Sequence, residues 1–158
     1  MEFIEPHLIP EAILRLVKES TIKLNMVTPQ CKISNWPAFL KSINLAQEQG
    51  IPINFYIKDG DYKSVAEVEA LNIAPTIVKN LNSILFMNEK EAIITTKNLM
   101  FTENGSALEM AFRTTERFEY NEIRDFFNAY ISNTENKFED TIPIHRFLKF
   151  EVGKSVSL

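Results

Sequence analysis

Histidine is the residue that limits the chemistry open to this chain, because most acid/base and nucleophilic schemes need an imidazole within hydrogen-bond reach of a partner. Only His7 and His145 are present, and no motif surrounds either of them. We therefore expect both to be solvated or hydrogen-bonded surface residues.

Cys31 is the single cysteine, so the chain can form neither an internal disulfide nor a cysteine-rich zinc site. Without a neighbouring histidine, its thiol is expected to be inert.

Carboxylates and cations offer two other kinds of chemistry. Glu89 and Glu109 could hold a divalent cation that activates water, although two carboxylates without a third ligand form a weak metal signal. A groove for nucleic acid could use phosphate contacts and stacking surfaces beside Phe147 and Phe150. Its cations would be Lys79, Lys90, Lys97, Arg146, Lys149 and Lys154. Glutamates are interleaved with these cations, so a mixed solvated surface is the favoured interpretation, and no metal site is expected.

The composition indicates one globular domain. The 158 residues carry 17 Lys and Arg against 21 Asp and Glu, a formal net charge of −4, and 45% of them are hydrophobic. This charge is not the positive field of a typical nucleic-acid binder. The first ten residues contain no basic segment followed by an apolar one, and no run of about 18 apolar residues occurs. We expect a cytoplasmic protein without a membrane span.

Helix and strand periods alternate along the first half of the chain. Apolar residues three and four apart predict helices, and alternation at every second residue predicts strands. Ser34 or Asn35 is expected to cap the second helix, and Gly50 to end it. The predicted order is a helix over 9–17, a strand over 22–26, a helix from about 35 to 49, a strand over 51–57, a helix over 61–72 and a strand over 75–78.

The second half of the chain no longer alternates helices with strands. Two short apolar strands, 84–87 and 92–95, are separated by a polar turn of the right length for an antiparallel hairpin. A strand over 108–112 follows, and then a helix whose apolar face holds Ile123, Phe126, Phe127, Tyr130 and Ile131. The fold class is therefore α/β, with a mixed, mainly parallel sheet flanked by helices. We expect one domain over 1–131 and a C-terminal tail, 132–158, that packs on the domain or on a partner.

Several segments, taken in order from Ile9 to Tyr130, resemble a phospholipase D-like domain of the HKD-nuclease type. They are Met26-Val27-Thr28-Pro29, the stretch 46–53, Asn80-Leu81-Asn82-Ser83-Ile84, the stretch 93–99 and Leu108-Glu109-Met110-Ala111-Phe112. The resemblance implies a hairpin that carries His-x-Lys, then an Asp at the turn and a small polar stretch on the return strand. In that family the His attacks phosphorus and the Lys neutralises phosphate oxygens. Members with one motif per chain complete the site by dimerising about a two-fold axis.

The reacting groups of that motif are missing from this sequence. The resemblance places Asn82 at the His and Ile84 at the Lys, and neither side chain can replace the chemistry of the original. Glu89 stands at the Asp, and Glu109 keeps a downstream Glu. Thr95, Thr96 and Asn98 form the polar return. We therefore expect no catalytic residue and no cofactor.

The favoured hypothesis is a non-enzymatic assembly, regulatory or binding module that forms a homodimer or joins a host complex. Residual binding at the old site would use Asn82, Thr96, Lys97 and Asn98. The first alternative is an active phosphodiesterase or nuclease with a substituted, metal-dependent site. The second is a non-catalytic nucleic-acid binder.

Overall fold

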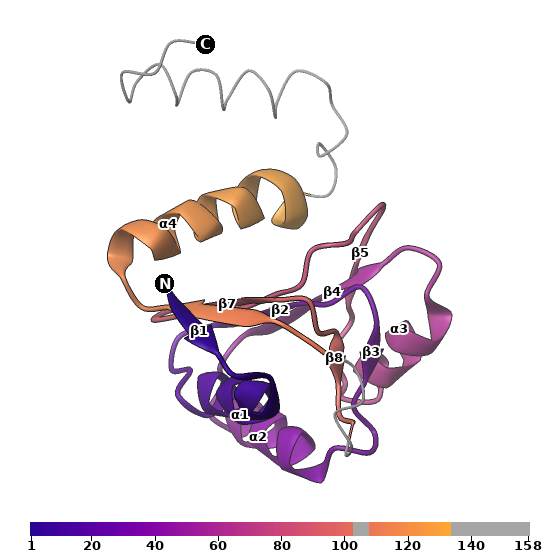
Figure 1. The fold of residues 1–158 in the computed structure, drawn as a ribbon. Helices are drawn as coiled ribbons and strands as arrows, with labels where there is room; N and C mark the ends of the chain where they lie inside the picture. The colour runs from indigo at the N-terminus through magenta and orange to yellow at the C-terminus, as the bar shows by residue number, and fades with distance from the viewer. Residues whose placement is uncertain (103–107, 134–158) are drawn as a thin grey trace. The chain divides into compact units, whose positions relative to one another are not determined.

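The structure is a computed structural model that describes residues 1–102 and 108–133, and Figure 1 shows its fold. It divides into a unit of residues 1–120 and a second unit that begins at Asn121. All but two residues of the predicted tail, 132–158, lie outside the described residues.

The first unit alternates strands and helices through its first half and is mostly strand afterwards. Its strands are β1 (Glu2–Ile4), β2 (Leu24–Val27), β3 (Cys31–Lys32), β4 (Ile53–Lys58), β5 (Thr76–Val78), β6 (Leu85–Asn88), β7 (Ala92–Thr95), β8 (Leu99–Met100) and β9 (Ala111–Thr114). Its helices are the 3-10 helix η1 (Pro6–Leu8), α1 (Ile9–Lys18), α2 (Pro37–Glu48) and α3 (Tyr62–Glu69). The helix α4 (Arg117–Phe126) begins in this unit and continues into the second, where the π-helix η2 (Phe127–Ser132) follows it.

The main sheet has seven strands in the order β1-β9-β7-β6-β2-β4-β5. β2, β4 and β5 run parallel to one another, and the helices α2 and α3 connect them. β6 and β7 form the predicted antiparallel hairpin, and β9 and β1 extend that half of the sheet with antiparallel pairs. β3 and β8 form a separate parallel pair. The α/β class and the mixed sheet with flanking helices are confirmed. Of the six strand pairs that the structure describes in the main sheet, two are parallel and four antiparallel, so the parallel pairing predicted for the sheet is limited to β2, β4 and β5.

The hydrophobic core of this unit lies on the sheet face that carries α1, α2 and α3 (Figure 1). Met26, Phe55, Phe86 and Ile93 come from four neighbouring strands and are fully buried. The apolar face of α1 is buried against them as its period predicted. Because each fully buried side chain of this size stabilises a fold by roughly 1.5 to 3 kcal/mol, this face holds the sheet and its loops in register.

Trp36 bears on two predictions, its own role in the core and the residue that caps α2. Its ring is buried and stacks on Phe39 and Phe101, with centroids 5.1 Å and 5.6 Å apart, so its role as a core anchor is confirmed. It also occupies the N-cap of α2, where no side chain caps the helix, so the prediction of Ser34 or Asn35 is wrong. Gly50, with φ +76°, follows α2 as predicted, because this left-handed conformation strains other residues.

Three predicted boundaries differ in the structure. β2 begins at Leu24, and Ile22 is 65% exposed because its backbone joins a loop held by side chains instead of the sheet. β9 begins only at Ala111, and Leu108 is 91% exposed. The last predicted helix becomes π-helical from Phe127, and this changes which side chains share a face. Phe127, Ala129 and Ile131 are buried, whereas Phe126 is 38% exposed.

Two kinds of feature are absent from residues 1–102 and 108–133. No helix there has the length and apolar character needed to cross a bilayer. The same residues bring together no group of three His, Cys, Asp or Glu side chains that could hold a metal ion.

Candidate functional site

The strand register gathers most of the predicted site residues at one edge of the main sheet. Val27, Leu85, Ile94 and Phe112 lie side by side on four neighbouring strands. The next residue beyond each of them, toward this edge, is Thr28, Ile84, Thr95 or Ala111. We call this the motif edge, defined by the positions Asn82, Ile84, Thr96, Asn98 and Glu109.

The two positions that the resemblance assigns to His and Lys differ in burial. Ile84 is only 7% exposed and belongs to the hydrophobic core, where its backbone oxygen accepts from the Thr95 N–H at 3.2 Å. Asn82 is exposed, and within the described part of the chain its side chain makes no hydrogen bond. Both residues precede β6, so the strand rule that puts alternate side chains on one face does not align them. Because Ile84 is buried in the core and Asn82 is exposed, the two side chains do not face one pocket together.

Asn98 fastens two loops of the motif edge to each other. Its Oδ1 accepts from the Gln30 N–H at 3.0 Å and lies 3.3 Å from the Thr28 hydroxyl. That hydroxyl donates to the Gln30 carbonyl and accepts from the Leu99 N–H at 2.9 Å. The loop after β2 is thus tied to the loop after β7, and the Asn98 Oδ1 and the Thr28 hydroxyl are used in holding the backbone.

The two threonines on the return strand also bond to the neighbouring chain segment. Thr95 Oγ1 donates to the Met110 carbonyl at 2.8 Å and accepts from the Lys97 N–H at 3.0 Å. Thr96 Oγ1 accepts from the Met110 N–H at 2.9 Å and lies 3.4 Å from Glu109 Oε1. Of the predicted site residues, Thr96 and Glu109 are the pair that the structure brings into contact.

Lys97 is buried, which its sequence position did not indicate. Its side chain is 8% exposed, and its Nζ lies 3.4 Å from Thr102 Oγ1. The described residues show no hydrogen bond from Lys97 to Asn82, Thr96 or Asn98. The four residues predicted to bind a ligand therefore share an edge of the sheet without converging through contacts of their own.

Glu89 lies at the opposite end of the hairpin, in the turn between β6 and β7. Its carboxylate accepts the backbone N–H groups of residues 21–23 at 2.9 to 3.3 Å, together with the Thr21 hydroxyl at 3.0 Å. Partial burial alone would raise the pKa of Glu89, but these N–H donors outweigh it and lower the pKa to about 2. The carboxylate is an anchor for the loop before β2.

The proposed metal pair is wrong. Glu89 lies at the turn, whereas Glu109 lies at the motif edge. Four residues of strand separate the two ends of the hairpin, a distance of about 13 Å. One cation cannot bind both carboxylates, and Glu89 already accepts from several N–H groups.

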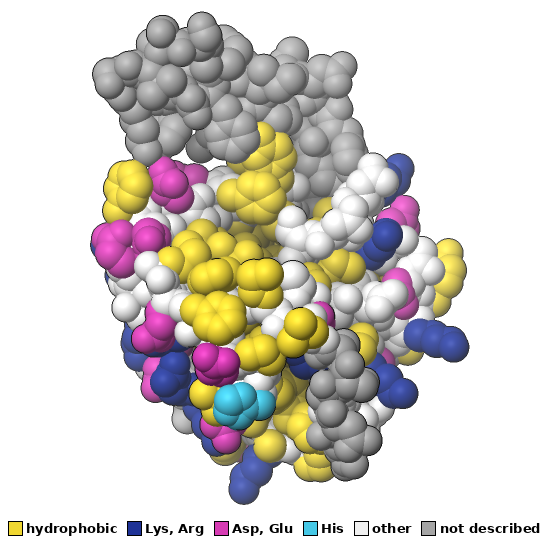
Figure 2. Space-filling view, viewed as in Figure 1, with side chains coloured by type: hydrophobic (Ala, Val, Ile, Leu, Met, Phe, Trp, Pro, Cys, Tyr) yellow, Lys and Arg dark blue, Asp and Glu magenta, His cyan; other side chains and the backbone are white. Residues whose placement is uncertain are grey.

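The predicted cationic groove is also divided by the structure. Lys90 lies at the turn, where its Nζ donates to the Glu19 carbonyl at 2.9 Å and lies 3.8 Å from Glu89. Lys97 is buried at the other edge. Arg146, Lys149 and Lys154 lie outside the described residues. Because Lys90 is at the turn and Lys97 is buried at the other end, the two hairpin cations do not form one positive surface. Figure 2 shows acidic and basic side chains both distributed around the visible face.

β1 was not predicted from the sequence, and neither was its place in the sheet. β1 pairs with β9 so that Ile4 lies opposite Ala111, at the motif edge, and exposed His7 follows three residues later. Three strand spacings, about 14 Å, separate the column of β1 from that of β6, so His7 does not replace the missing imidazole. A three-residue strand has too short a pattern to be found without its partner. The expectation of a surface histidine is confirmed for His7.

Cys31 is the remaining reactive candidate, and its surroundings suppress its reactivity. It is buried in β3, and its N–H donates to Ser64 Oγ at 2.8 Å. Burial raises the pKa of the thiol well above its usual range, and the negative charges of Glu67 and Asp61 add to this. The thiolate that a nucleophile needs is therefore disfavoured.

Solved structures match this arrangement of strands and helices. The phospholipase D family member Nuc from Salmonella typhimurium aligns with a TM-score of 0.64 at 10% identity, over 86% of this chain and 92% of that one. Phosphatidylserine synthase from Haemophilus influenzae Rd KW20 gives 0.65 at 11% identity, over 84% of this chain and 37% of that one. The fold is phospholipase D-like. No family model and no curated protein matches the sequence.

A third neighbour extends the range of proteins with this fold. TrmBL2, described as an archaeal chromatin protein with a novel mode of DNA binding, aligns with a TM-score of 0.53 at 7% identity. The match covers 80% of this chain and 49% of TrmBL2. At such identities the likeness concerns the phospholipase D-like fold alone, because function depends on the side chains of the site.

Proposed function

We propose that this chain is a catalytically degenerate phospholipase D-like domain that acts as a non-enzymatic assembly, regulatory or binding module and forms a homodimer. The observation that carries the proposal is the burial of Ile84 in the hydrophobic core, at the position where the fold's motif would place a lysine. Asn82 has no titratable group, and no described histidine occupies its place. A phosphoryl-transfer site of the usual kind has neither nucleophile nor cation here.

An exposed apolar surface supports a role in protein interaction. Phe3, Ile94 and Phe112 lie opposite one another on β1, β7 and β9, and the rings of Phe3 and Phe112 pack edge to face at 5.5 Å. Phe3 is 49% exposed, Ile94 39% and Met110 49%. Figure 2 shows apolar side chains gathered in this region of the visible face. Contiguous exposed apolar side chains of this kind are typical of protein interaction surfaces.

The test combines an activity assay with the native mass. The purified full chain is incubated with a generic phosphodiester and with labelled single- and double-stranded DNA, in Mg²⁺, in Mn²⁺ and in chelator, and its mass is measured by light scattering. We expect no turnover and the mass of a dimer. Turnover that Glu109→Gln abolishes would contradict the proposal, and so would a clean monomer with nothing bound.

A second candidate is DNA binding without chemistry, because the phospholipase D-like fold also occurs in TrmBL2, which is described as a DNA-binding chromatin protein. A filter-binding titration at low and moderate salt tests it, because phosphate contacts weaken steeply as salt rises. Retention at low salt that declines at moderate salt would support binding, and no retention at low salt would exclude it.

A further inference from the structure

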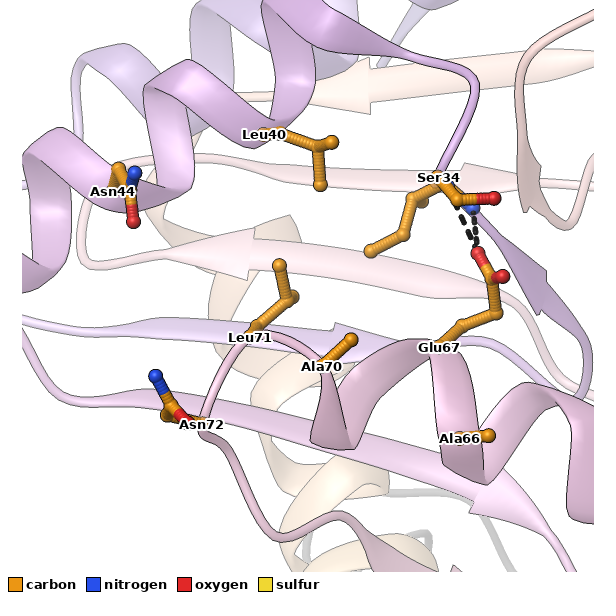
Figure 3. Close-up of a pocket in the computed structure, with 9 residues that line it drawn as sticks. Ser34, Leu40, Asn44, Ala66, Glu67, Ala70, Leu71 and Asn72 are labelled. Carbon is orange, nitrogen blue, oxygen red and sulfur yellow. Dashed lines mark hydrogen bonds between the residues drawn. The ribbon is translucent and has the colours of Figure 1, made fainter.

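A pocket of about 400 Å³ lies between α2 and α3, away from the motif edge (Figure 3). α1 packs on α2, but α2 and α3 stand apart, and Leu40 from one side and Leu71 from the other face each other across the gap. Ala66 of α3 and Ala70, the C-cap residue that follows this helix, line this space four residues apart. Because these side chains are small, the gap stays open and its apolar lining is half-exposed.

Polar groups mark the two ends of the pocket. At one end, Glu67 Oε1 accepts the N–H groups of Ile33 at 2.6 Å and Ser34 at 2.9 Å, which fixes the carboxylate in place (Figure 3). At the other end lie the exposed amides of Asn44 and Asn72, whose side chains make no hydrogen bond within the described residues. Asn72 is held at φ +63°.

This lining selects for a peptide of particular chemistry. The volume is in the range of ligand pockets and accommodates apolar side chains between Leu40 and Leu71. The fixed carboxylate of Glu67 favours a cation beside them, and side-chain amides both donate to and accept from a peptide backbone. An apolar segment interrupted by lysine or arginine meets all three requirements.

The chain itself contains such a segment after its last described residue. Residues 142–152 read Ile-Pro-Ile-His-Arg-Phe-Leu-Lys-Phe-Glu-Val, with Arg146 and Lys149 placed among large apolar residues. We propose that the pocket between α2 and α3 of one copy binds the 142–152 segment of a second copy. This inference rests on the proposed homodimer, since a two-fold arrangement makes the contact twice, once with each pocket.

The experiment measures the dimer dissociation constant of the full chain by sedimentation equilibrium. Ala70→Arg fills the pocket and adds a charge that repels Arg146, and Asn44→Arg does the same from α2. We expect each to weaken the dimer about tenfold or more, and Arg146→Glu with Lys149→Glu to do likewise. The matched control is Ala38→Arg, on an exposed position of α2 outside the pocket, which should leave the constant unchanged. Combining Ala70→Arg with Arg146→Glu should recover part of the loss.

Two results would overturn the inference in different ways. A dimer unaffected by the pocket and segment variants would exclude this pocket and leave the proposed homodimer on another surface. A monomeric wild-type chain would contradict both the proposed homodimer and the contact between two copies. If Ala70→Arg then altered the proteolysis of 142–152, the result would indicate that the segment binds the pocket of its own copy. Phosphodiester turnover, by contrast, would contradict the proposed function without touching this contact. Thermal unfolding of each variant confirms that it remains folded.

Discussion

The two ends of the β6–β7 hairpin use their polar residues differently. At the turn, Asn88 is fully buried, and its Oδ1 accepts from the N–H groups of Lys90 and Glu91 at 2.8 Å each. Its Nδ2 donates to the Leu16 carbonyl at 2.9 Å, which ties the turn to α1. At the open end, Asn82 is exposed without a hydrogen bond in the described structure. Asparagine therefore has a structural role at the turn, where Asn88 bonds to the backbone, and is a surface residue at the open end, where Asn82 is exposed.

The difference shows which polar side chains of the hairpin have a structural role. Glu89 holds the backbone of residues 21–23, and Asn98 holds that of Gln30. Neither Asn82 nor Ile84, by contrast, uses its side chain to hold a loop: Asn82 is exposed and Ile84 packs in the core. The polar side chains of the hairpin that make bonds therefore serve the fold. This contrast agrees with the proposed non-catalytic role.

The largest expected effect is that of Ile84→Lys. Ile84 is 7% exposed and lies in the core, so the substitution removes apolar burial and places an ammonium group among hydrophobic side chains. We expect a loss of about 4 kcal/mol in the free energy of unfolding. Urea denaturation monitored by circular dichroism measures it, and Asn82→His should cost little.

The control for this prediction is Ile22→Lys, at a residue that is 65% exposed and lies before β2. We expect it to lose less than about 1 kcal/mol. If Ile84→Lys were as stable as Ile22→Lys, position 84 would accept a cation. The combined Asn82→His and Ile84→Lys change could then restore the family's motif with two substitutions.

A smaller, pH-dependent effect on stability is expected for Glu89, at the turn of the hairpin. The folded-state pKa of Glu89 is about 2, below the value of 4.5 for a free glutamate, so its ionised form stabilises the fold. This contribution is fully present above pH 4.5 and is lost as the pH falls toward 2. Glu89→Gln should therefore be less stable than the wild type by about 2 kcal/mol at pH 7.

Urea midpoints measured between pH 7 and pH 2 check this prediction. The difference between Glu89→Gln and the wild type should shrink below pH 4.5 and nearly vanish near pH 2. Glu109→Gln is the control at the other end of the hairpin, where a single 3.4 Å contact with Thr96 predicts a change under about 0.5 kcal/mol at pH 7. A difference for Glu89→Gln that is constant across the pH range would contradict the anchor assigned to its charge.

The elements that the sequence predicted are those with enough residues to show a period. α1 has five buried apolar positions at helical spacing, and β4 alternates over six residues. β1, β3 and β8 have two or three residues each, and their partners lie far away in the sequence, so no local pattern marks them. The same limit applies to the helix start at Trp36, where packing on Phe39 and Phe101 acts in place of a side-chain cap.

The candidate site divides along the same line. The resemblance located the hairpin, which the structure confirms, because its strands and turn depend on residue identity and order. The assignment of Asn82 and Ile84 to the motif's His and Lys stays a prediction. The resemblance could not reveal that Lys97 is buried or that Glu89 binds a loop 66 to 68 residues away, because both depend on tertiary packing. The separate idea that Glu89 and Glu109 share a cation failed for the same reason, because the length of the hairpin keeps them apart.

The smallest expected effect separates the two asparagines of the open end. Asn98→Ala removes the acceptor of the Gln30 N–H and a neighbour of the Thr28 hydroxyl, and we expect it to lose about 1 kcal/mol. Asn82→Ala removes no described hydrogen bond and should stay within about 0.5 kcal/mol of the wild type. Urea denaturation measures both, and amide hydrogen exchange at Gln30 should accelerate in Asn98→Ala alone. Equal losses for the two variants would mean that Asn82 also holds the fold, and the division between structural and free polar positions would fail at this edge.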